Sequence, residues 1–459
     1  MSKDIDMLHG PLLGKILLFA LPLAASSVLQ QLFNSVDVAV VGHYASSEAL
    51  AAVGSNAPVI SLLVNLFLGL SMGANVVIAN HIGQNDQGGI RKAISTIVLV
   101  SLICGFFLLF LGVAVARPIL TWMGTPDKVL DMAVMYLRIY FLGMPFIMIY
   151  NFGAAILRSR GDTRRPLYIL IAAGIVNTVF NLVFVICFHM GVEGVAIATG
   201  IANALSAFMI VMMLHREPEP YRIHPRAMKI HWKELKRMIQ IGVPAGLQGV
   251  IFSISNVAVQ SAINSYGSAA IAGSAAALTF EFYCYYVVEA FNGAAISFIG
   301  QNYGAGNKER VRRIFRICMS VSVIVCIILN WLFVSQDDFF LNLFSTDPDV
   351  HVFGRLRLHH VLAYHVLICT YEIAGSCLRG MGYSLLPTLF TVFGTCVLRL
   401  VWVYAVAPHF PGFGNLLRVY PMSWIVTGTL VMTAWFIIFR RWHPASEGRS
   451  TGQSGTMAA

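Results

Sequence analysis

Long apolar runs alternate with short polar segments along the whole chain. Each run approaches or exceeds the ~18 residues that an α-helix needs to cross the hydrocarbon core of a membrane. The pattern therefore predicts an all-α membrane protein with twelve spans. These spans lie at about 15–42, 53–80, 93–116, 130–157, 166–188, 193–214, 235–264, 270–298, 314–334, 353–378, 386–407 and 417–439.

The two halves of the chain repeat one another in sequence. Leu21-Pro22-Leu23 corresponds to Val243-Pro244-Ala245, and Ile82-Gly83-Gln84-Asn85 recurs as Ile299-Gly300-Gln301-Asn302. Because each half holds an even number of spans, the repeat predicts two six-helix bundles related by a pseudo-twofold axis along the membrane normal. The expected parts are an amino-terminal lobe at 1–214, a cytoplasmic linker at 215–232, a carboxy-terminal lobe at 233–443 and a disordered tail at 444–459.

The first span carries three polar side chains on one face. Gln30, Asn34 and Asp37 are separated by four and three residues, so they share one side of a helix. A carboxylate at membrane depth costs several kcal/mol and usually marks a proton or ion pathway. Asp37 is therefore the first candidate for a proton or cation site, Asn34 is a candidate ligand beside it, and Gln30 is a candidate for its wider network.

The fifth and sixth spans supply polar groups that can meet Asp37. Asn177 and Asn181 are four residues apart, and so are Thr199 and Asn203. None of these groups can face lipid without a large penalty, so all should turn into the bundle. Carboxylate, amide and hydroxyl oxygens are suitable ligands for Na⁺. The carboxyl group among them can instead take and release a proton. The alternative is a hydrogen-bonded cluster that only holds helices together.

The second half of the chain has no matching carboxylate. Val259 occupies the position that corresponds to Asp37. Acids among aromatic residues suggest instead a cavity for a lipophilic cation, through charge and cation–π attraction. The candidate cavity residues are Glu281, Glu289, Glu372, Tyr283 and Phe291. The alternative is ordinary packing in which Arg399 neutralises one of the glutamates.

Composition and charge agree with a membrane protein. The chain is 57% hydrophobic and 11% charged, whereas soluble proteins carry about 25% charged residues. Its net charge of +10 resides mostly in the even-numbered loops and the two tails. This positive-inside pattern places both termini in the cytoplasm of a multi-pass protein and argues against nucleic-acid binding. The expected partners are the lipid bilayer and small molecules, and we expect a monomer.

Metal and cofactor chemistry finds little support in the sequence. The eight cysteines show no metal-ligand spacing. His359, His360 and His365 form a single histidine cluster, whereas a membrane di-iron enzyme would need several. We therefore expect no cofactor, and no metal other than Na⁺ at Asp37.

Several motifs together resemble the multidrug and toxic compound extrusion (MATE) transporters. The motifs are Leu21-Pro22, the run 30–42 around Asp37, Ile82-Gly83-Gln84-Asn85, the loop 157–166 and the segment 191–196. The resemblance covers about residues 10–440. It implies a twelve-helix, V-shaped antiporter of a bacterial cytoplasmic membrane. Such a protein exports drugs or other lipophilic, often cationic, compounds in exchange for Na⁺ or H⁺, and it is not an enzyme.

The resemblance also implies roles for particular residues. The amino-lobe cation site of the family maps onto Asp37, Asn177, Asn181 and Thr199. Tyr136 and Asn151 are candidates for its wider network, and Pro22 is the candidate hinge. Some branches of the family carry an essential Glu on the seventh span. This chain has no acid there, so we expect coupling through the amino-terminal lobe.

Two other classes of protein remain as alternatives. A lipid-linked oligosaccharide flippase would need a cationic cavity, and the central spans offer few candidates beyond Arg138 and Arg399. A membrane-embedded enzyme would need a catalytic motif, and none is recognisable in the sequence.

Overall fold

The computed structural model describes residues 4–44 and 46–444, and these residues are almost entirely helical. The long helices are α1 (Leu12–Tyr44), α2 (Ser47–Gly83), α3 (Gln87–Trp122), α4 (Asp127–Leu142), α5 (Met144–Arg160), α6 (Arg164–Leu182), α7 (Val192–His215), α8 (Trp232–Asn264), α9 (Ser268–Gly304), α10 (Lys308–Ser335), α12 (Pro348–His360), α13 (Ile368–Gly380) and α17 (Val419–Arg441). Shorter helices are α11 (Asp337–Asn342), α14 (Leu385–Thr391), α15 (Leu398–Val401) and α16 (Phe413–Leu417). The π-helical segments are η1 (Val183–Cys187), η4 (Val392–Val397) and η5 (Trp402–Val406), and the 3₁₀ turns are η2 (Pro225–Ala227), η3 (Leu362–Leu367) and η6 (Ala407–His409).

The described residues form twelve membrane spans, as the hydrophobic pattern predicted. Eleven are apolar helices long enough to cross a bilayer, and the twelfth is the pair α4 and α5. The sequence predicted one continuous helix over 130–157, but the structure bends this span by 46° at Gly143. The reason is local, because Pro145 at the start of α5 has no N–H with which to continue the hydrogen bonds of α4.

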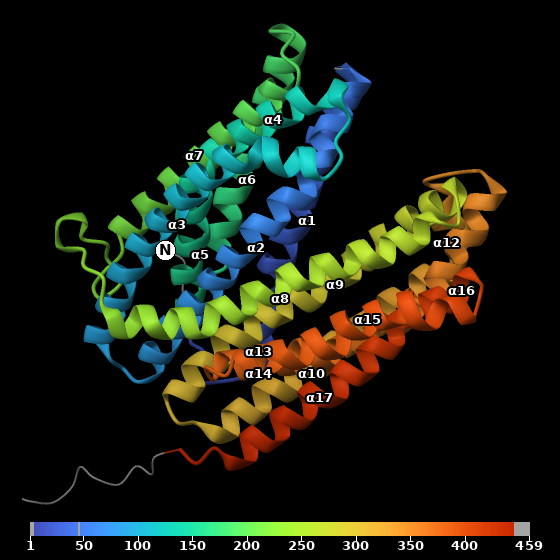
Figure 1. Cartoon of the computed structure of the whole chain (residues 1–459). Coiled ribbons are helices and arrows are strands. Elements are labelled where there is room, and N and C mark those ends of the chain that lie inside the picture. The colour runs from blue at the N-terminus through green and yellow to red at the C-terminus, as the bar shows by residue number, and fades with distance from the viewer. Residues whose placement is uncertain (1–3, 45, 445–459) are drawn as a thin grey trace, which may run out of the picture.

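The spans form two bundles, α1–α7 and α8–α17, that meet at one end and spread apart at the other (Figure 1). The contact follows α2 and α8, where glycines allow the backbones to approach. A Cβ added at Gly69 would lie 2.3 Å from the backbone nitrogen of Gly246, and one at Gly83 would lie 1.9 Å from the carbonyl oxygen of Gln301. We call the end that carries Gly83 and the linker the closed end, and the opposite end the open end.

Helix α1 is shared between the two lobes. Near the closed end, Ile16 and Phe19 belong to the buried core of the carboxy-terminal lobe, and the Phe19 ring meets the edge of Phe298 at 5.5 Å between centroids. Near the open end, Val41 belongs to the core of the amino-terminal lobe. Pro22 lies inside the helix between these two parts. The candidate hinge therefore stands where α1 passes from one lobe to the other.

Candidate cation site

Asp37, Asn177, Asn181 and Thr199 are brought together by three helices of the amino-terminal lobe. The Asn181 amide donates a short hydrogen bond to Oδ1 of Asp37, and it also lies 3.3 Å from Oδ1 of Asn177. The amide of Asn177 donates to Oγ1 of Thr199 at 3.2 Å. The hydroxyl of Thr199 donates in turn to the Val195 carbonyl at 2.9 Å. The result is a continuous polar chain that ends on one carboxylate.

Local sequence explains why α1 and α6 come close enough for this contact. Asn177 and Asn181 are one turn apart on α6, and both side chains are buried. One turn earlier, Gly174 packs against Phe33 of α1, where an added Cβ would lie 1.9 Å from the ring. Sequence reasoning missed Gly174. Its only signal was a glycine one turn before Asn177, which does not reveal the residue that packs against it.

Two features of the site point to an unfilled need for a positive charge. Asp37 makes no ion pair with a Lys or Arg among the described residues. Beside it, Oδ1 of Asn181 is buried and accepts no hydrogen bond from the described residues. Buried polar oxygens are almost always paired, so an acceptor left over next to a carboxylate is a natural ligand for a cation or a protonated group.

The other predicted members of the site are placed differently. Gln30 and Asn34 are exposed, and within the described part of the chain they make no hydrogen bond to Asp37. Asn151 donates to the Ile147 carbonyl of its own helix at 2.9 Å. Asn203 is half-buried and likewise makes no hydrogen bond to the polar chain.

Two tyrosines of α4 lie within electrostatic reach of Asp37. Tyr136 is buried, and its ring stacks on that of Tyr140 at 6.3 Å between centroids. The charge of Asp37 acts on both hydroxyl groups. The sequence singled out Tyr136 but not Tyr140, although the spacing of four residues would have grouped them on one face.

The carboxy-terminal lobe uses its acids in another way, and two expectations need correction. Glu281 is neutralised by Arg357, with contacts of 2.6 and 3.0 Å, and not by Arg399. Arg399 instead donates to Oδ1 of Asn256 at 2.7 Å. Phe291 is buried in the core of the lobe and does not line a cavity. Polar and apolar residues are spread around α9 without one polar face, so its sequence does not show which way such a ring points.

Of the remaining cavity candidates, Glu289 and Glu372 lie near each other and near Arg158 of the amino-terminal lobe. Glu289 is exposed on α9, and the charges of Arg158 in the opposite lobe and of Glu372 act on it. Glu372 accepts a hydrogen bond of 3.0 Å from the amide of Asn292. Tyr283 is 36% exposed on the same helix as Glu289. Two carboxylates and an arginine therefore meet where the bundles come together.

Two repeated six-span lobes, with ionisable groups inside each lobe and between them, define a membrane transporter and not an enzyme. The profile of the MatE family matches residues 22–183 and 244–405, one segment in each lobe. The chain belongs to this family, whose characterised members include multidrug efflux transporters.

Comparison with individual proteins agrees with this assignment. A Bacillus subtilis protein named "Probable multidrug resistance protein YoeA" is 28% identical, over 82% of this chain and 83% of its own length. A Shewanella oneidensis protein named "FAD transporter" is 24% identical, over 93% and 95% of the two chains. A solved structure of an outward-facing multidrug resistance MATE transporter is 21% identical, with a TM-score of 0.88 over 96% of this chain and 98% of that one, which shows a shared fold.

Proposed function

We propose that this chain exports lipophilic, often cationic, compounds across a bacterial cytoplasmic membrane in exchange for Na⁺ or H⁺ bound at Asp37. The observation that supports the proposal most directly is the buried Oδ1 of Asn181, which has no donor although it lies beside an unpaired carboxylate. A bare Na⁺ or a protonated Asp37 would satisfy both oxygens. The open Oδ1 of Asn181 differs from the unpaired buried amide oxygens of Asn56 and Asn302 in lying beside a carboxylate that has no ion pair among the described residues.

The sidedness of the proposed exchange follows from the basic loops. The closed end carries the linker and loops rich in Lys and Arg, so the positive-inside rule places it in the cytoplasm. The open end then faces the outside, and Asp37 lies in the part of α1 that runs toward it. A cation from outside would reach Asp37 in this conformation.

Coupling in this proposal works through α1. Neutralising Asp37 changes its hydrogen bond to Asn181 and so the packing of the outer part of α1 against α6. The inner part of α1 belongs to the other lobe, with Pro22 between the two parts. A bend at Pro22 would therefore change how the lobes meet. The exchange is driven only to the extent that ion and substrate bind the two conformations with different affinity.

Glu289 and Glu372 are the proposed contacts for the positive charge of the substrate, because these two carboxylates lie near each other. Arg158 lies in the same region and favours a second candidate, an anionic substrate. One of the relatives is named a FAD transporter. The two candidates differ in the charge of the compound that should dissipate the ion gradient.

The test is exchange in everted membrane vesicles loaded with Na⁺ or acid. A lipophilic fluorescent cation should dissipate one of the two gradients in the wild type, and Asp37→Asn should abolish this effect. Asn34→Ala is the matched control, since Asn34 is exposed one turn earlier on the same helix. The antiport proposal fails if neither a cationic nor an anionic compound dissipates either gradient. Dissipation by a flavin nucleotide alone would support the second candidate.

A further inference from the structure

The segment that precedes α1 crosses from one lobe to the other at the closed end. Asp4 forms an ion pair with Arg160, and the backbone N–H of Ile5 donates to the Gly161 carbonyl at 3.4 Å, both in the amino-terminal lobe. Only two residues later, Met7 is 1% exposed in the core of the carboxy-terminal lobe. We call residues 4–11 the first strap.

The carboxy-terminal lobe holds this strap mainly through one guanidinium group. Arg310 of α10 donates to three backbone carbonyls, at 3.1 Å to Met7, 2.9 Å to His9 and 3.0 Å to Gly10. The Asn302 amide adds a hydrogen bond of 3.0 Å to the Met7 carbonyl. A planar guanidinium group has several N–H donors and can bind several carbonyl oxygens at once. Hydrogen bonds from a charged donor are among the stronger ones. This contact also gives a role to the repeated motif that ends in Asn302.

The strap is folded in advance for this contact. Oδ1 of Asp6 accepts the backbone N–H groups of Leu8 at 2.9 Å and His9 at 3.1 Å. Desolvation raises the pKa of Asp6, but these two hydrogen bonds outweigh it and leave the pKa below its ordinary value. Asp6 is therefore charged at neutral pH and keeps the turn that presents the carbonyls to Arg310.

The internal repeat supplies a second strap, residues 229–231, at the matching place. Met7 and Lys229 each lie fifteen residues before the corresponding prolines, Pro22 and Pro244. The backbone of Lys229, just before α8, exchanges hydrogen bonds of 2.7 and 2.8 Å with the hydroxyl of Ser95 on α3. Each lobe thus has its entry segment bound to the third span of the other lobe. This reciprocal arrangement is what the pseudo-twofold axis requires.

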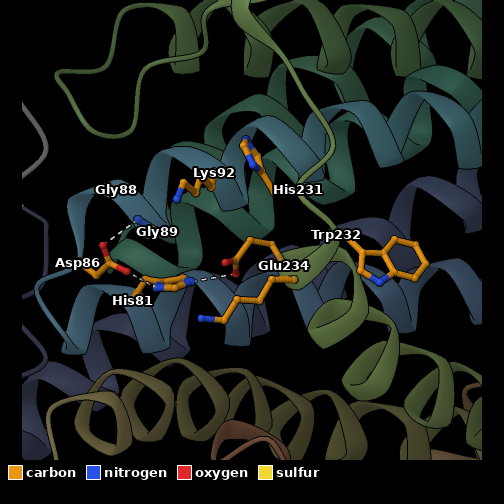
Figure 2. Close-up of a pocket in the computed structure, with 9 residues that line it drawn as sticks. His81, Asp86, Gly88, Gly89, Lys92, His231, Trp232 and Glu234 are labelled. Carbon is orange, nitrogen blue, oxygen red and sulfur yellow. Dashed lines mark hydrogen bonds and ion pairs between the residues drawn. The ribbon is translucent and has the colours of Figure 1, made fainter.

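A buried contact between His81 and Glu234 accompanies the second strap, and Figure 2 shows it at a pocket of about 290 Å³. His81 of α2 contacts Glu234 of α8 through Nε2 at 2.9 Å and Asp86 through Nδ1 at 3.1 Å. The backbone N–H of Gly89 holds the pKa of Asp86 below its usual range, so this carboxylate is charged as well. The closed end is therefore fastened twice, once by each strap.

We propose that the two straps hold the cytoplasmic ends of the lobes together and that the first strap must leave one lobe before the transporter opens to the cytoplasm. The cytoplasmic location rests on the proposed function, but the fastening does not. Ile5 and Met7 are anchored on opposite lobes, and two extended residues span at most about 7 Å. The chain between Ile5 and Met7 is too short to lengthen further. The lobes therefore cannot separate at this end while both residues keep their contacts.

The test measures access to the contact between the lobes. Ser297 is fully buried there and shares hydrogen bonds with Asn75 of the other lobe. Ser297→Cys would provide a thiol that a polar maleimide reaches only when the closed end opens. Labelling would be followed in everted vesicles without substrate or ion gradient. Labelling of the parent chain would be subtracted, because the native Cys187 is exposed at the other end.

In this background, Arg310→Ala should raise the labelling rate about tenfold, the shift that loss of charge-assisted hydrogen bonds of ordinary strength produces. Arg310→Lys should lie between, since an ammonium group cannot reach three carbonyls at once. Arg313→Ala is the matched control, because Arg313 is exposed on the same helix and pairs with Glu309 of that helix, one turn away. The labelling rate of Arg313→Ala should equal that of Ser297→Cys alone.

Equal labelling in Arg310→Ala and Arg313→Ala would overturn the proposal, and so would a rise confined to right-side-out vesicles. If Arg310→Ala does not accumulate, Ser95→Ala tests the second strap in the same assay and should also raise labelling. Unchanged labelling in that variant would contradict the account. Failure of ion exchange at Asp37 would leave these results unchanged, so the two proposals can fail separately.

Discussion

The two lobes share a fold, but Asp37 of the amino-terminal lobe and Glu281 of the carboxy-terminal lobe have different partners. In the amino-terminal lobe, Asp37 is bonded to the neutral amide of Asn181. In the carboxy-terminal lobe the matching position is Val259, and the buried acid Glu281 is bonded to the guanidinium of Arg357. A carboxylate with a fixed countercharge has no need of another cation, whereas one surrounded by amides does. The proposal is that charge compensation, more than burial, separates a structural acid such as Glu281 from an exchangeable one such as Asp37.

The largest effect should come from breaking the compensated pair. Glu281→Gln leaves Arg357 buried without its countercharge, which costs about 3–5 kcal/mol of stability in comparable pairs. Thermal unfolding of the purified transporter in detergent would measure the loss. Glu309→Gln is the control, since its pair with Arg313 is exposed and such pairs contribute about 0–1 kcal/mol. Similar unfolding of the two variants would mean that the buried pair is not a structural element.

A smaller effect should follow from separating α1 and α6. Gly174→Ala places a methyl group against Phe33, and overpacking of this kind costs about 1–3 kcal/mol. The distance between Asp37 and Asn181 should increase. The rate of ion-driven exchange should therefore fall by more than the loss of folded protein explains. Gly200→Ala is a close control, because Gly200 follows Thr199 and has open space around its Cβ position. Loss of exchange in both variants would show that the spacing of α1 and α6 is not what matters.

The smallest effects compare two asparagines at matching positions of the repeat. Asn256 is exposed like Asn34, but it accepts a hydrogen bond from the buried Arg399, and Asn256→Ala would leave that donor without its acceptor at a cost of about 1–3 kcal/mol. Asn34 is exposed, so Asn34→Ala should change stability by less than about 0.5 kcal/mol. Unfolding of the two variants side by side gives the difference. If Asn34→Ala were the more destabilising, the assignment of structural roles to the two lobes would be reversed.

Much of this architecture follows from the sequence because it depends on periodicity. Apolar runs of membrane length predict the spans, and spacings of four residues predict that Asn177 and Asn181 share a face with access to Asp37. The apolar run alone does not reveal the bend at Gly143, although Pro145, a visible helix breaker two residues later, was a signal for it. The pairing of Glu281 with Arg357 joins distant segments, and the sequence offered Arg399 instead, which the fold places against Asn256.

The straps show the same limit at the closed end. The repeat aligns Met7 with Lys229, yet neither residue carries a motif, because both are held through backbone atoms. Backbone acceptors are present at every residue, so only the packing of the two lobes selects which ones Arg310 reaches.

The central claim is that the uncompensated carboxylate of the amino-terminal lobe carries the exchanged ion. The most direct test measures the number of ions that move for each molecule of exported substrate. It compares proteoliposomes that contain the wild type with proteoliposomes that contain Asp37→Asn. The account predicts a fixed ratio of Na⁺ or H⁺ to substrate for the wild type, and substrate movement without ion movement, or none at all, for Asp37→Asn. An unchanged ratio in Asp37→Asn would contradict it.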